Sequence, residues 1–194
     1  MRAVALALSV TAASACVAAG CGGGGGHPSS ASHASSTGPT GPRLSATMAL
    51  TSPAFPSLGA LPARFTCDGL DISPPLGIDG TPLGTSELAL VLHDVDANGF
   101  LHWVVFAIPP DVVLIREDEL PPNALQATTG FGPARYGGPC PPRGRTHHYV
   151  FELYAERTRL SLEPGGQGPV AVQAIEAGAS AKAVLIGTYR RAGS

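Results

Sequence analysis

Three short, nearly continuous runs of apolar residues most constrain how this chain can fold. They cover Glu87–His93, Leu101–Ile108 and Tyr149–Ala155, and stretches containing glycine or proline separate them. The chain has 194 residues, with 25 glycines, 19 prolines and only 13% charged residues. This composition favours many turns and short strands over long surface helices. Apolar runs of this length are typical of buried strands, so we expect a β-rich domain built around them.

Weaker patterns predict the remaining elements. Ala46–Leu50 and Ala63–Thr66 are candidates for short strands, and Leu185–Tyr189 for a final one. One helix is expected over Val170–Ala183, which is rich in alanine and carries apolar residues near helical spacing. The predicted fold is mainly β, a Greek-key β-sandwich with one or two short helices near the C-terminus.

The N-terminal residues have the features of an export signal. Arg2 precedes the apolar stretch Ala3–Ala19, which is too short and too rich in alanine to be a convincing membrane span. Ala18-Ala19-Gly20-Cys21 then resembles a bacterial lipobox, although Ala18 stands where leucine is usual. We therefore expect a lipoprotein signal peptide over residues 1–20 and lipidation of Cys21. The alternative is an ordinary cleaved signal peptide in which Cys21 has no such role.

The residues that follow divide into a tether and a domain. Residues 21–43 are mostly Gly, Ser, Ala, Thr and Pro and contain little that could offset the entropy of ordering, so we expect a flexible tether. Residues 44–194 hold the apolar runs and form the predicted domain. The chain is thus expected to be exported to the cell envelope and held at a membrane by its N-terminal lipid.

Charge and cysteine content narrow the function further. The formal net charge of −2 argues against a large basic surface and therefore against nucleic acid as a partner. Once residues 1–20 are removed and Cys21 is lipidated, Cys67 and Cys140 remain in an oxidising compartment. They either form a disulfide or stay as two reduced thiols, and composition does not decide between these.

Polar residues gather where the predicted strands end. Asp94 and Asp96 follow the first run, His102 lies in the second, and His147 and His148 precede the third. Each has a simpler explanation, because Asp-Ala-Asn-Gly is an ordinary turn and a single histidine in an apolar run is often a core residue. Their recurrence at strand ends favours a site. Imidazoles beside carboxylates can hold an anion, to which the Gly137-Gly138 backbone can add N–H donors.

Other chemistries find little support in the sequence. No His-x₃-His or Cys-x₂-Cys spacing is present, so we predict no metal site and no cofactor. No nucleophile elbow or phosphate-binding loop is present either, so we predict that the protein is not an enzyme.

Taken together, these stretches resemble the phosphatidylethanolamine-binding protein family, and within it the bacterial Raf-kinase-inhibitor-like branch. The resemblance spans Leu44–Arg190. It rests on Phe65-Thr66-Cys67-Asp68-Gly69, Ser73-Pro74-Pro75-Leu76, Leu88–Asp96, His102-Trp103-Val104-Val105, Ile108-Pro109, Tyr136–Pro142, His147–Leu153 and Gly187-Thr188-Tyr189. Two motifs depart from the family pattern: Asp94-Val95-Asp96-Ala97-Asn98 lacks both prolines of Asp-Pro-Asp-Ala-Pro, and His148 replaces the arginine of Gly-x-His-Arg.

The resemblance implies a β-sandwich with a small anion-binding cavity for phosphate-like head groups. By position, its ligand-binding residues would be Asp94, Phe100, His102, Gly138, Cys140, His147 and Tyr149. In the family pattern Cys67 and Cys140 flank this pocket, which makes a disulfide between them the tentative expectation.

We therefore expect an extracytoplasmic binding protein for a small anionic or phospholipid head-group ligand, with a homodimer left open. Two alternatives come from other functional classes. One is an inhibitor or interaction module acting on a protease or kinase, which a large apolar patch beside the pocket would favour. The other is a hydrolase that uses the His/Asp cluster, which turnover of the ligand would favour.

Overall fold

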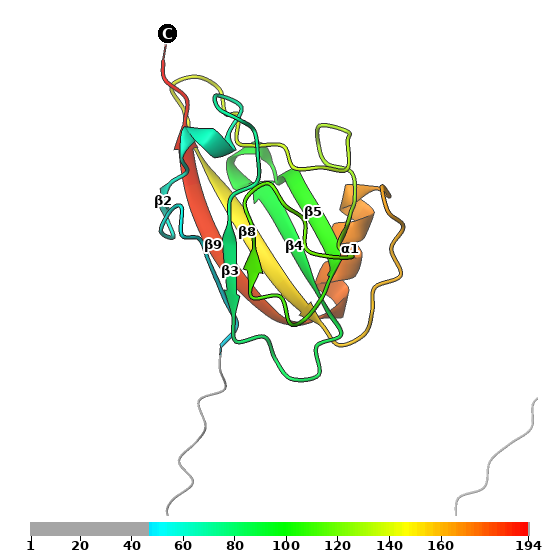
Figure 1. Ribbon diagram of the computed structural model, residues 1–194. Helices are drawn as coiled ribbons and strands as arrows, with labels where there is room; N and C mark the ends of the chain where they lie inside the picture. Colours follow the sequence, from blue (N-terminus) through cyan, green and yellow to red (C-terminus); the bar gives the residue numbers. More distant parts are fainter. Residues whose placement is uncertain (1–46, 194) are drawn as a thin grey trace, which may run out of the picture. The chain divides into compact units, whose positions relative to one another are not determined.

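The computed structural model describes residues 47–193 and shows two β-sheets and one α-helix (Figure 1). A small sheet has the strand order β1-β3-β6, and a larger sheet has the order β2-β9-β8-β4-β5-β7. Most neighbouring strands are antiparallel, and β2 runs parallel to β9. The elements are β1 (Ala49–Thr51), β2 (Gly59–Ala60), η1 (Ala63–Phe65), β3 (Leu76–Asp79), β4 (Glu87–Asp94), η2 (Val95–Ala97), β5 (Phe100–Ile108), β6 (Leu114–Ile115), β7 (Leu125–Gln126), β8 (Thr146–Glu156), α1 (Gly168–Gly178) and β9 (Ala179–Arg190).

Strand β4 is apolar along its length because both of its faces are buried. Leu88, Leu90 and Leu92 point into the core between the two sheets, where they join residues such as Ile78 of β3 and Phe151 of β8. The intervening side chains face the opposite way and pack beneath α1. This second cluster contains Ala89, Val91, Val104, Phe106, Ala171 and Ile175. Burial on both faces removes the usual alternation of apolar and polar residues, which explains the continuous run in the sequence. The mainly β sandwich predicted from the sequence is confirmed.

Two predicted elements were wrong in their extent or type. The helix expected over Val170–Ala183 ends at Gly178, and the alanine-rich residues after it begin β9. There the backbone pairs with β8, with Ala183 opposite Leu153, so sheet pairing overrides the helical propensity of alanine. The strand expected over Ala63–Thr66 is instead the 3₁₀ turn η1.

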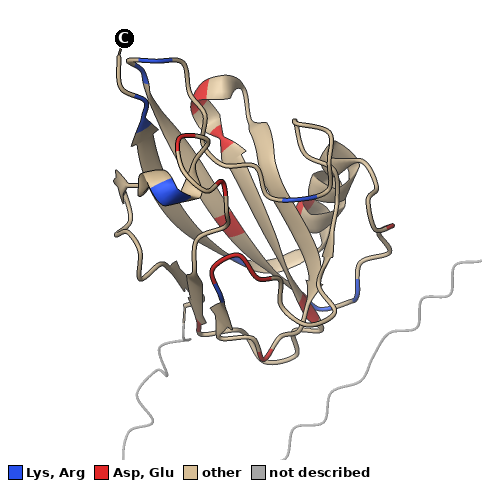
Figure 2. Ribbon diagram, turned by 45° about the horizontal axis from the view of Figure 1, so that its top comes forward, with Lys and Arg blue, Asp and Glu red and all other residues tan. Residues whose placement is uncertain are grey.

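The predictions for the N-terminal region lie outside the described residues. These are the signal peptide over residues 1–20, the lipidated Cys21 and the tether over residues 21–43. Among residues 47–193, no helix combines the length and apolar character needed to cross a membrane. Figure 2 shows that the basic positions of the described residues occur at several separate places, with acidic positions between them.

Candidate functional site

One end of the large sheet carries a cavity of about 190 Å³, here called the imidazole pocket. Asp94 ends β4 and pairs across the sheet with Phe100, at the start of β5, and with Tyr149 of β8. This register brings the ends of three strands together. The pocket is lined by Asp94, Ala97, Phe100, His102, Phe131, Cys140, Pro141, Pro142 and His147. Five of the seven predicted ligand residues are therefore in one cavity: Asp94, Phe100, His102, Cys140 and His147.

A β-bulge turns His102 toward this pocket. Leu92 of β4 pairs with Trp103 of β5, but the next residue, His93, pairs with Leu101. His102 is thus the extra residue on β5. A bulge interrupts the alternation of side chains and redirects the inserted one, which explains how His102 can line the pocket beside the core residue Trp103.

The loop after β7 holds the His102 ring in one orientation. Nδ1 of His102 donates to the carbonyl oxygen of Gly137 at 2.7 Å, and the Gly137 N–H donates to the carbonyl oxygen of His102 at 3.0 Å. Since a carbonyl can only accept, the proton resides on Nδ1 and leaves Nε2 as an acceptor. The side chain is 3% exposed, and burial lowers the pKa of His102 below its usual value. Burial thus favours the neutral form of this ring.

His147 is held by a buried carboxylate. Its Nδ1 lies 2.8 Å from Oδ2 of Asp94 and donates to it. The other carboxylate oxygen of Asp94 accepts from the backbone N–H of Asp96 at 2.9 Å, at the start of η2. Asp94 therefore serves both of the roles considered for it, as a turn residue and as the partner of a histidine.

Aromatic rings form one wall of the pocket. The ring centroids of Phe100 and Phe131 are 4.9 Å apart, and His102 lies 5.2 Å from Phe100 and 5.3 Å from Phe131, all in edge-to-face arrangements. Glycines make room for these rings, because a Cβ on Gly130 would overlap Phe100 and one on Gly137 would meet Phe131 at 2.5 Å. The pocket thus combines two imidazoles with an apolar wall.

Two predicted ligand residues do not line the imidazole pocket. Tyr149 is fully buried, with its ring centroid 5.2 Å from that of His102, and its hydroxyl makes no hydrogen bond within the described residues. Burial, reinforced by the nearby Asp94 charge, raises the pKa of Tyr149. Gly138 lies in the adjoining loop, where its N–H already donates to Oδ1 of Asp71 at 2.6 Å. The backbone donor that we expected from Gly138 is therefore used inside the protein.

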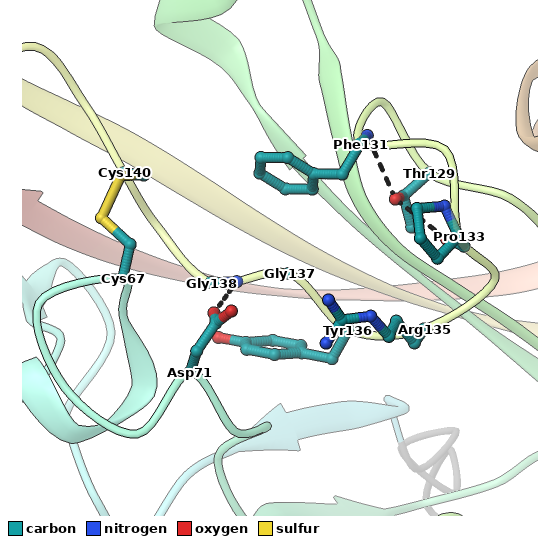
Figure 3. A pocket seen from close by; sticks show the side chains of 10 residues that line it. All are labelled: Cys67, Asp71, Thr129, Phe131, Pro133, Arg135, Tyr136, Gly137, Gly138 and Cys140. Carbon is teal, nitrogen blue, oxygen red and sulfur yellow. Dashed lines mark hydrogen bonds between the residues drawn. A yellow bond between two sulfur atoms is a disulfide. The ribbon is translucent and has the colours of Figure 1, made fainter.

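A second cavity of about 210 Å³, here called the disulfide cavity, shares Phe131 and Cys140 with the imidazole pocket. Cys67 and Cys140 are joined by a disulfide with a Cα–Cα distance of 5.4 Å. Figure 3 shows this bridge at one end of the cavity, Phe131 on one side, and Asp71, Tyr136 and Arg135 along another. The sequence did not point to Asp71, Phe131 or Arg135, because they lie in irregular loops. The placement of Phe131 between Gly130 and Gly132 was the only local signal.

The part of the chain that the structure describes contains no group of three or more His, Cys, Asp or Glu side chains arranged to hold a metal ion. His148 belongs to neither cavity. It is exposed, and its Nδ1 lies 2.9 Å from Oδ2 of Asp96.

Known proteins are similar to this chain in sequence and in fold. A Methanothermobacter thermautotrophicus protein named only as a UPF0098 protein is 44% identical over 151 residues, which cover 74% of this chain and 99% of that protein. The candidate lipoprotein LppC of Mycobacterium tuberculosis is 39% identical over 145 residues, covering 73% of this chain and 72% of that protein.

Among solved structures, E. coli YbcL, described as a member of the mammalian PEBP family, has a TM-score of 0.71 and 30% identity. That match covers 75% of this chain and 99% of YbcL. A candidate phosphatidylethanolamine-binding protein homologue from Chlamydia trachomatis has a TM-score of 0.69 and 33% identity, over 76% of this chain and 99% of that one. Residues 51–190 match the family described as phosphatidylethanolamine-binding protein. The chain therefore belongs to the phosphatidylethanolamine-binding protein family, as its motifs predicted.

Proposed function

We propose that this protein binds a small phosphate-type or phospholipid head group in the imidazole pocket, and that it does so outside the cytoplasm while anchored through a lipid on Cys21. One observation carries the binding proposal. Two buried imidazoles, His102 and His147, line the same cavity, and each is fixed through Nδ1 by a partner within the protein. Neither Nε2 has a hydrogen-bond partner among the described residues, so both remain available to a ligand.

The two rings suit different atoms of one ligand. Nε2 of the neutral His102 accepts a hydrogen bond. Nδ1 of His147 is paired with the Asp94 carboxylate, which would balance the charge of an imidazolium, and an imidazolium donates through Nε2. A phosphate group that retains one proton matches both, since it offers a negatively charged oxygen and an O–H. No Lys or Arg lines this pocket, so a protonated imidazole would be its source of positive charge.

The size of the pocket and the descriptions of similar proteins support the same proposal. A volume of about 190 Å³ is small, which suits a head group rather than an acyl chain. The family description names phosphatidylethanolamine binding, and the relative LppC is described as a candidate lipoprotein.

Calorimetric titration with inorganic phosphate and with O-phosphoethanolamine tests the proposal. Charge-assisted hydrogen bonds contribute about 1.5–3 kcal/mol, so His147→Ala should weaken binding by roughly 10- to 150-fold. His148→Ala is the matched control, because it removes the neighbouring imidazole, which lines neither cavity, and should leave the affinity unchanged.

Two results would contradict the proposal. Equal affinity in the wild type and His147→Ala would place the ligand elsewhere. Release of inorganic phosphate from O-phosphoethanolamine, followed by ³¹P NMR and abolished by His147→Ala, would favour the hydrolase alternative instead.

A further inference from the structure

The disulfide cavity carries charges of both signs that the protein itself does not neutralise. Asp71 and Arg135 both line it, yet no ion pair joins them or links either one to another side chain within residues 47–193. Figure 3 shows both side chains along the same side of the cavity, with Tyr136 between them. A ligand with one cationic and one anionic group would complement this arrangement.

The Asp71 carboxylate is fixed in place and still has an open acceptor. Its Oδ1 accepts from the Gly138 N–H at 2.6 Å, while Oδ2 has no hydrogen-bond partner in the described residues. Asp71 is partly buried, so a cation that reaches it is less screened by water than at an open surface. The half-exposed ring of Phe131 also lines this cavity, and an aromatic ring favours an ammonium group.

The other polar groups of this wall are already occupied. The Tyr136 hydroxyl donates to the carbonyl oxygen of Phe65 at 2.7 Å, and the Gly138 N–H is held by Asp71. The Arg135 guanidinium, which is exposed at the rim, is thus the group of this wall best placed to meet an anion. The recognition elements of the cavity are therefore one carboxylate, one guanidinium and one aromatic ring.

The two cavities are adjacent parts of one site. They share Phe131 and Cys140, and Gly137, which holds the His102 ring, lines the disulfide cavity. A ligand whose phosphoryl group occupies the imidazole pocket would extend past the shared residues Phe131 and Cys140 to place its other end beside Asp71.

We infer that the disulfide cavity is a second subsite for an amino-acid-type zwitterion, and that the ligand is a phosphoserine-like molecule. Its phosphoryl group lies in the imidazole pocket, its ammonium group lies between Asp71 and Phe131, and its carboxylate meets Arg135. This inference rests on the proposed function. Free phosphoserine, a phosphate monoester, and the serine head group of a phospholipid, a diester, share the phosphoryl, ammonium and carboxylate groups. Of the two, the monoester alone can retain the O–H from which Nε2 of His102 would accept a hydrogen bond.

Calorimetric titrations with three probes dissect the two subsites. Inorganic phosphate reports on the imidazole pocket alone, O-phosphoethanolamine adds the ammonium group, and O-phospho-L-serine adds the carboxylate. We expect the affinity of the wild type to rise in this order. A fourth probe, glycerophosphoserine, separates the two sources: stronger binding than O-phospho-L-serine indicates the lipid head group, and weaker binding the free monoester.

Two variants assign the added affinity to residues. Asp71→Asn keeps the acceptor for Gly138 and removes the charge, so it should weaken both ammonium-bearing probes about tenfold and leave inorganic phosphate unchanged. Arg135→Gln should weaken O-phospho-L-serine alone by about three- to fivefold, because an exposed ion pair contributes less. Arg145→Gln, an exposed arginine that lines neither cavity, controls for the change in net charge, and thermal unfolding verifies that each variant folds.

The outcomes separate failure of this subsite from failure of the proposed function. If all three probes bind the wild type equally, the subsite is wrong while the phosphate pocket stands. The same conclusion follows if Asp71→Asn and Arg135→Gln act no differently from Arg145→Gln. If inorganic phosphate and both phosphorylated amines fail to bind, the proposed function fails and this inference with it.

Discussion

A single inserted residue, His102, determines much of the chemistry of the imidazole pocket. The bulge in β5 turns its side chain into the pocket, burial keeps it neutral, and Gly137 selects its tautomer. His102 is thus suited to accept a hydrogen bond, whereas His147, with Asp94 behind it, is suited to donate one. We therefore propose different roles for two residues of the same type, because their surroundings differ.

The lowered pKa of His102 predicts how stability depends on pH at this residue. In the unfolded chain the ring takes up a proton near pH 6.5, whereas in the folded protein it does so only at lower pH. Acidification below about pH 6.5 therefore favours the unfolded state, and His102 contributes to the loss of stability there. We expect His102→Gln to lose less unfolding free energy than the wild type between pH 7.5 and pH 5 in denaturant titrations. Equal losses of unfolding free energy in the two proteins would show that the pKa of the buried His102 ring is not lowered.

Glu156 should make stability depend on pH in the opposite direction to His102. It is fully buried, neither carboxylate oxygen has a hydrogen-bond partner in the described residues, and burial together with the Glu87 charge raises its pKa to about 7. Its unfolded value is lower, so stability is lost as the pH rises through about 7 and the buried group ionises. Glu156→Gln should remove roughly 1–3 kcal/mol of this loss between pH 5.5 and pH 8.5, measured by urea unfolding. Glu163→Gln, at an exposed position, is the control and should follow the wild type.

Among the elements, α1 is held to the sheet by its buried face. Ile175 is fully buried against β4 and β5, whereas Val170, on the same helix, is 57% exposed. We expect Ile175→Ala to lower the free energy of unfolding by about 2–4 kcal/mol, because it removes buried methyl groups and leaves a cavity. Val170→Ala should cost less than about 0.5 kcal/mol. Similar losses for both substitutions would contradict this packing of α1.

The loop around Gly138 is joined to the segment after η1 at several points. The Cys67 N–H donates to the carbonyl oxygen of Pro139, and the Gly138 N–H donates to Asp71. The disulfide between Cys67 and Cys140 joins the same two segments covalently. The bridge spans 73 residues, and in the chain-entropy model a loop of this length stabilises the fold by about 4 kcal/mol. A double Cys67→Ser, Cys140→Ser variant should therefore lose a few kcal/mol in denaturant unfolding, within the range of about 2–5 for native disulfides. Peptide mass spectrometry without reduction checks the bridge directly, and alkylation of both thiols in native protein would exclude it.

At the scale of the whole molecule, we propose that the domain works at a membrane surface through a lipid on Cys21, which lies outside the described residues. The wild type should partition into the detergent phase, and Cys21→Ser into the aqueous phase, because multiple acyl chains hold a protein at a membrane firmly. Cys16→Ser changes a cysteine within the predicted signal peptide, so it is the matched control and should partition like the wild type. Recovery of all three proteins in the aqueous phase would rule out the anchor.

The sequence by itself determined the class of fold and the family. The runs Glu87–His93, Leu101–Ile108 and Tyr149–Ala155 all lie within strands, because burial of an apolar segment between turns is largely a local property. Four of the seven predicted ligand residues, Asp94, Phe100, His102 and His147, lie on these strands and came together once the strands paired, and Cys140 joins them from a loop.

The tertiary structure decided what local pattern could not. Alanine-rich residues 179–183 became strand because β8 offered pairing partners, and His102 faces the pocket because one extra residue shifts the register of β5. Asp71, Phe131 and Arg135 meet in one cavity only because irregular loops far apart in the sequence fold against each other. Register and loop contacts depend on which distant segments pack together, and residues within a short window carry no information about that choice.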